Sequence, residues 1–65
     1  MIMKLKIEIV MDNAAFDPAP SVEVGRILHA LADEAAIGHM FDEIGDRMAI
    51  MDSNGNRVGE AKVTR

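Results

Sequence analysis

The chain has 65 residues, which is enough for one small domain spanning residues 1–65, and a domain of this size buries only about 60% of the surface its unfolded chain exposes. With no cysteine and only two histidines, it has neither disulfides nor a structural zinc site to stabilise it. A net charge of −4 argues against nucleic acid as a partner, and no apolar run approaches the roughly 20 residues of a membrane helix. We expect a cytoplasmic protein of a bacterial host, because no export signal is recognisable.

A β-strand is predicted over residues 3–11, where apolar residues hold the odd positions and charged residues hold even ones. This period of two is typical of a strand with one buried face, and Ile7 is expected in the core. The strand should end at Asp12 and Asn13, whose side chains compete for backbone hydrogen bonds. A loop with two prolines follows, and we expect Phe16 to anchor it in the core.

A helix is predicted to begin with Ser21 as its N-cap and to stop at Gly38. Gly25 lies inside this helix and suggests that the helix approaches the sheet closely. Apolar residues recur at spacings of three and four and define one buried face. These residues are Val24, Ile27, Leu28, Leu31 and Ala35.

A β-hairpin is predicted at the C-terminal end, after a connector over 37–45 that shows no clear period. Asn54 and Gly55 are the favoured central pair of a type I′ turn and are flanked by apolar alternation. That turn places Met51 opposite Val58, and the rest of the register follows from it.

These elements predict an α+β fold, a single β-α-β-β domain in which one helix packs on one face of a three-stranded sheet. The strand order stays open. On the other face, an apolar group rimmed by charges would be exposed, as at many interaction surfaces. We expect a partner to bind Ile2, Val10, Met51 and Val58 there. The alternative is that the stems of neighbouring lysines and arginines cover these residues.

No catalytic or metal-binding arrangement stands out. His29 and His39 are ten residues apart, which is not the spacing of a helical metal site. The two serines, Ser21 and Ser53, have capping and turn roles, and no nucleophile and base can be paired. We therefore expect no enzyme activity, no cofactor and no metal.

Acidic residues gather around the helix end and the connector, including Asp33, Glu34, Asp42 and Glu43. Such clusters are usually solvated surface. They could instead bind a basic partner protein, and both interpretations stay open.

Three stretches together resemble a group of small phage and prophage proteins: Asp12 to Phe16 (DNAAF), the helical segment from Glu23 to Ala32, and Asp52 to Gly59. In that group a first strand leads to a DNAAF motif, a helix carries a VARIL-type stretch, and a final hairpin carries NGN-x-VG. Gly25 stands where the group has alanine, and the connector over 37–45 has no counterpart. The group has no assigned activity, so the resemblance implies a viral or prophage origin and a fold.

The function expected from the sequence is that of a small acidic protein-binding module without enzyme activity, encoded by a phage or prophage. An inhibitor of a host defence complex such as CRISPR fits this description. The alternative is a self-associating structural protein that uses the open sheet face as a homodimer interface.

Overall fold

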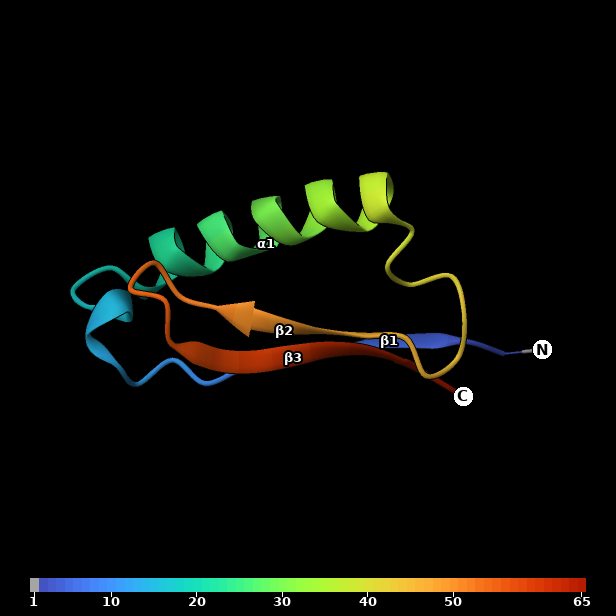
Figure 1. The fold of residues 1–65 in the computed structure, drawn as a ribbon. Coiled ribbons are helices and arrows are strands. Elements are labelled where there is room, and N and C mark those ends of the chain that lie inside the picture. The colour runs from blue at the N-terminus through green and yellow to red at the C-terminus, as the bar shows by residue number, and fades with distance from the viewer. Residues whose placement is uncertain (1) are drawn as a thin grey trace.

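A computed structural model describes residues 2–65 and shows the predicted α+β fold. One helix lies over a three-stranded antiparallel sheet (Figure 1). The elements in chain order are β1 (Lys4–Ile9), the short 3-10 helix η1 (Ala14–Phe16), α1 (Pro20–Gly38), β2 (Arg47–Met51) and β3 (Arg57–Thr64). Within the described residues, no helix is both long and apolar enough to cross a membrane.

The strand order, which the sequence left open, is β1-β3-β2, so the last strand is the central one. β3 pairs with β1 in the register Ile7 to Ala61 and with β2 in the register Met48 to Ala61. β3 requires glycine at position 59, beside β1, because a Cβ there would overlap the carbonyl oxygen of Glu8. The close backbone approach expected at Gly25 is instead found at Gly59, and nothing lies within 4 Å of a Cβ built on Gly25.

The hairpin turn differs from the predicted type I′. Gly55 has φ +82°, but among described residues other than glycine only His39 has a positive φ, so Asn54 does not. The Asp52 N–H donates to the Asn56 carbonyl at 2.9 Å, which makes a three-residue loop with Gly55 in the left-handed position. The added loop residue shifts the pairing by one position, so that Met51 pairs with Arg57 rather than Val58. A bulge at Val58 of β3 then restores the predicted pairing from Ile50 and Gly59 onward.

The ends of α1 also differ in detail from those predicted. The helix begins at Pro20, with Ala19 as N-cap, so Ser21 lies in the first turn and is not the cap. Proline suits this position because its missing N–H has no helical partner there. The last helical residue is Gly38 as predicted, but the left-handed residue is the C-cap, His39, at φ 51°.

The core lies between α1, η1 and the β2–β3 half of the sheet, and it contains Phe16 as predicted. The buried residues of this cluster are Phe16, Ile27, Leu31, Ile50, Val58 and Ala61. Helix α1 packs against η1 and β2 and leaves β1 at the side. The radius of gyration, 12.4 Å, exceeds the roughly 11 Å expected for a compact chain of this length, which reflects an elongated molecule.

Most of the face of β1 that was expected to be buried lies outside the core, as does Leu28 of α1. Ile7 and Leu28 are each 43% exposed, and Met3, Leu5 and Met11 are similarly exposed. Of this face Ile9 alone packs against the core. A helix is about 10 Å across and strands are about 4.8 Å apart, so one helix covers about two strands. The third strand, here β1, stays largely uncovered.

Candidate protein-binding site

A buried carboxylate, that of Asp52, organises the hairpin turn. Its Oδ1 accepts hydrogen bonds from the N–H groups of Asn54 (2.9 Å) and Asn56 (2.8 Å), and its Oδ2 accepts one from Nδ2 of Asn13 (2.7 Å). Burial alone would raise the pKa of Asp52, but these hydrogen bonds outweigh burial and hold the pKa below its ordinary value. The acidic and amide side chains around Asn54 and Gly55 therefore stabilise a hairpin turn, as the sequence predicted for these residues.

A second buried carboxylate, that of Glu23, joins α1 to the same turn. Arg26 donates to both of its oxygens, at 2.8 and 2.9 Å, and the Ser53 N–H donates to Oε2 at 2.8 Å. The hydrogen bond from Arg26 lowers the pKa of Glu23 most, burial opposes it, and Ser53 lowers it further. These contacts give the two carboxylates structural roles.

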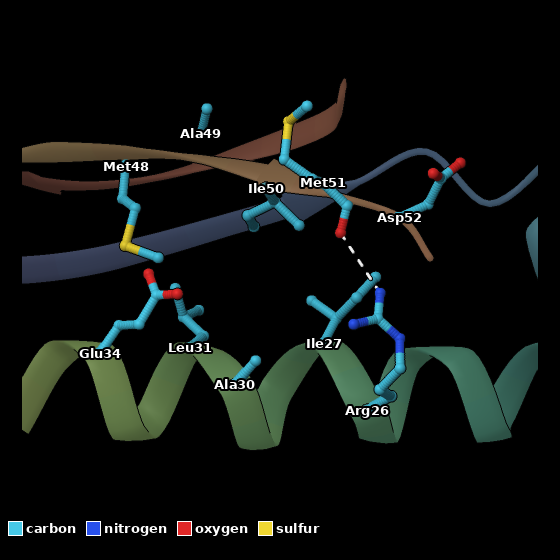
Figure 2. Close-up of a pocket in the computed structure, with 10 residues that line it drawn as sticks. All are labelled: Arg26, Ile27, Ala30, Leu31, Glu34, Met48, Ala49, Ile50, Met51 and Asp52. Atoms are coloured by element: carbon cyan, nitrogen blue, oxygen red, sulfur yellow. Dashed lines mark hydrogen bonds between the residues drawn. The ribbon is translucent and has the colours of Figure 1, made fainter. Parts of the chain in front are cut away.

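A pocket of about 270 Å³ lies between α1 and β2 (Figure 2). Ile27, Leu31 and Ile50 form its apolar floor, and Arg26 and Glu34 come from the helix on its rim. Nη2 of Arg26 also lies 3.4 Å from the carbonyl oxygen of Met51. The arrangement provides no nucleophile and base pair, and in the described part of the chain no group of three acidic or histidine side chains is placed to hold a metal.

The contact face predicted from the sequence is only partly present. Ile2, Val10 and Met51 are exposed, and Figure 2 shows Met51 pointing away from the helix. Val58, however, is only 7% exposed and belongs to the core, so its expected place in a contact surface is wrong. The bulge beside Met51 breaks the alternation on which that expectation depended.

Charged side chains occupy the centre of that face. Lys6 lies opposite Lys62, and Glu8 lies opposite Glu60. Arg47 reaches Glu60 at 3.7 Å from the other side of β3. The exposed apolar residues of this face therefore do not form one continuous patch, because Ile2 and Val10 lie beyond opposite ends of β1.

The predicted acidic residues Asp33, Glu34, Asp42 and Glu43 are all exposed. Oδ2 of Asp42 lies 3.1 Å from Nδ1 of His39, which gives His39 a local structural contact after the helix. The exposure of the four acids fits a solvated surface and a binding patch equally.

Exposed apolar side chains instead lie along the helix side of β1, and we call them the β1 strip: Met3, Leu5 and Ile7. Leu5 and Ile7 share a face with buried Val63 and Ala61, their partners on β3. Successive helix residues turn by about 100°, so Leu28 lies on the side of α1 opposite Arg26, which is on the β2 side. Leu28 therefore borders the strip.

The backbone of β1 is unpaired along the edge beside this strip. The Val10 N–H donates to the Val58 carbonyl at 2.8 Å, which shows that even-numbered residues of β1 bond to β3. In an antiparallel strand the alternate residues point the other way. Leu5, Ile7 and Ile9 therefore direct their N–H and C=O groups toward the free edge.

The other edge of the sheet, that of β2, is less open to pairing. β2 has five residues and directs the Met51 carbonyl toward Arg26. Short strands and charged side chains are common ways of protecting an edge. The two edges thus differ, and within the described residues the backbone of β1 has no such side-chain contact on its free edge.

The sequence pattern predicted that the β1 strip lies in the core. Alternation shows which residues share a face of the sheet, but it does not show whether a helix covers that face. One feature of the sequence could have predicted the exposed strip: it contains one predicted helix and three predicted strands, and one helix covers only about two strands. Comparison of the chain with family models, curated proteins and solved structures finds no match.

Proposed function

We propose that this chain is a protein-binding module without enzyme activity, which binds an extended segment of another polypeptide along β1. The observation that carries the proposal is the β1 strip beside an unpaired strand edge. Leu5 is 49% exposed, and Ile7 and Leu28 are only slightly less so. An added strand would satisfy the backbone of the edge and bury alternate side chains on the strip.

The experiment replaces Leu5 with a photo-crosslinking amino acid in the chain expressed in a bacterial host. The control places the same group at Ile37, which is 84% exposed near the end of α1. We expect a discrete crosslinked species from position 5 that disappears when Ile7→Lys is added. Absence of crosslinking at position 5, or the same species from both positions, would contradict the proposal.

A phage or prophage accessory role, such as inhibition of a host defence complex like CRISPR, is the more specific form of this proposal. It is supported by the resemblance in the DNAAF, helical and NGN-x-VG stretches and by the exposed acidic residues. In the test, the four acids are changed to amides: Asp33→Asn, Glu34→Gln, Asp42→Asn and Glu43→Gln. In a bacterial host with an active CRISPR complex, the parent chain should reduce the destruction of an incoming plasmid. The variant should keep the parent's melting temperature and lose this inhibition. Inhibition equal to that of the parent would remove the acidic surface from the proposal.

A further inference from the structure

We propose that the partner of β1 is β1 of a second copy, paired antiparallel about a two-fold axis at Ile7. This inference rests on the proposed function, because it names the occupant of the same edge. Three observations carry it: the backbone groups that point outward, the order of charges along β1, and the position of the apolar strip.

The backbone of β1 is self-complementary in this register. Ile7 lies opposite the partner's Ile7, and Leu5 lies opposite the partner's Ile9. All of these residues direct their N–H and C=O groups toward the free edge, as deduced from the bond between Val10 and Val58. Each opposed pair can therefore exchange two backbone hydrogen bonds.

The charges on the other face of β1 match in the same register. Lys6 lies opposite the partner's Glu8, and Glu8 lies opposite the partner's Lys6. Opposite charges in direct cross-strand pairs stabilise antiparallel pairing. Lysines on an edge strand normally oppose association, and here the partner's Glu8 offsets Lys6.

Neighbouring registers are less favourable. An axis at Lys6 places two lysines opposite each other, and an axis at Leu5 places Lys4 opposite the partner's Lys6. Like charges in these positions destabilise the pair. An axis at Ile9 leaves Leu5 opposite the partner's Asn13, which lies beyond the end of β1. The axis at Ile7 pairs residues 5–9 of each β1 with residues 5–9 of the other.

The same two-fold axis places the β1 strips of the two copies side by side. An axis perpendicular to the sheet keeps both helices on one side and joins the two three-stranded sheets into one of six strands. The two strips then form one apolar floor between the helices. Leu28 and the partner's Leu28 border this floor, and within it Ile7 packs beside the partner's Ile7 and Leu5 beside the partner's Ile9.

Charge reversal tests the register on the purified full chain. The variants are Lys6→Glu, Glu8→Lys and the double exchange, and light scattering measures mass against the 7.1 kDa of one chain. We expect the parent to be a dimer, and each single variant to dimerise about tenfold more weakly or worse, since symmetry changes two pairs at once. The double exchange restores dimerisation. Mixing the two single variants gives a heterodimer, because at positions 6 and 8 the first variant then carries only glutamate and the second only lysine.

Loss of folding cannot imitate this pattern. Within one chain Lys6 faces Lys62 and Glu8 faces Glu60, so each single reversal replaces a like-charge pair with an opposite-charge pair. The folded monomers should be at least as stable as the parent chain, as thermal melts at low concentration will show.

A parent chain that stays monomeric at hundreds of micromolar, or single variants that dimerise like the parent, would overturn the inference. The crosslinking experiment separates this failure from that of the proposed function. A crosslink from position 5 to a different protein, with a monomeric parent, leaves strand addition standing and removes the second copy. No crosslink at all removes both.

Discussion

The side-chain amide of Asn13 donates a hydrogen bond to the carboxylate of Asp52 over 2.7 Å, although the two residues are 39 positions apart. The same Asn13 accepts the Ala15 N–H at 2.9 Å and so caps η1. Glu23 reaches the neighbouring Ser53 from α1. Residues from the DNAAF stretch, from the first turns of α1 and from the hairpin therefore meet at one end of the molecule, where they hold the turn between β2 and β3.

Acid should destabilise the protein through Glu23 and Asp52, and Asp52→Asn should weaken that dependence. Both pKa values are lowered in the folded chain, so the unfolded chain binds more protons in acid. Their stabilisation is complete above the ordinary carboxyl pKa of about 4 and is lost as the pH falls toward the lowered values. Thermal melts between about pH 7 and about pH 3 test this. The Asp52→Asn variant should melt lower at neutral pH and decline less in acid; parallel curves would contradict the role of Asp52.

Gly59→Ala should prevent or severely weaken folding, whereas Gly25→Ala should stabilise the protein by up to about 1 kcal/mol. A Cβ at Gly59 would overlap the Glu8 carbonyl oxygen, while a Cβ at Gly25 has no atom within 4 Å. Urea denaturation of the two variants measures both effects. A Gly59→Ala variant as stable as the parent would show that β1 does not pair with β3 in this register.

The hairpin turn should be sensitive at Gly55 and tolerant at Asn54. Gly55→Val forces a β-branched residue to φ +82°, at a cost of about 1–3 kcal/mol, and Gly55→Asn should cost less because asparagine tolerates that region. Asn54→Ala keeps the backbone N–H that donates to Asp52 and should change the melting temperature little. A large loss at Asn54 would instead favour a type I′ turn.

Leu31→Ala should cost about 2–5 kcal/mol and Leu28→Ala less than about 1 kcal/mol in the folded monomer. Leu31 is in the buried cluster, whereas Leu28 is 43% exposed. Denaturation at low micromolar concentration compares the two monomers, and equal losses would contradict the placement of Leu28 outside the core. At high concentration Leu28→Ala should also weaken dimerisation, because the side chain borders the β1 strip.

The sequence predicted the local features of the fold from short-range patterns. Phe16 was expected in the core, and the pairing of Met48 with Ala61 and of Ile50 with Gly59 follows from the hairpin. The turn type was missed because Asn-Gly alone favours type I′. The buried Asp52 carboxylate, which accepts both turn amides, is a tertiary feature that depends on Asn13.

The candidate site could be predicted only as a set of residues with alternating polarity. Strand order decides which strand lies under α1, and the loop through η1 carries no signal that places β1 beside β3. Ile7 and Leu28 have the periodicity of core residues, but α1 covers only about two of the three strands, so both side chains stay exposed at the side of β1. Periodicity cannot separate a side chain buried within one chain from one that a second chain would bury.

The difference between the two sheet edges determines how far assembly can proceed. Pairing through β1 uses the same surface on both copies, so it closes on itself and leaves only the β2 edges at the ends of the joined sheet. Arg26 at the Met51 carbonyl disfavours another strand there. In the proposed dimer, β1 is the edge used for recognition and the Arg26 contact makes the β2 edge less open to pairing into fibrils, so loss of Arg26 should raise that tendency.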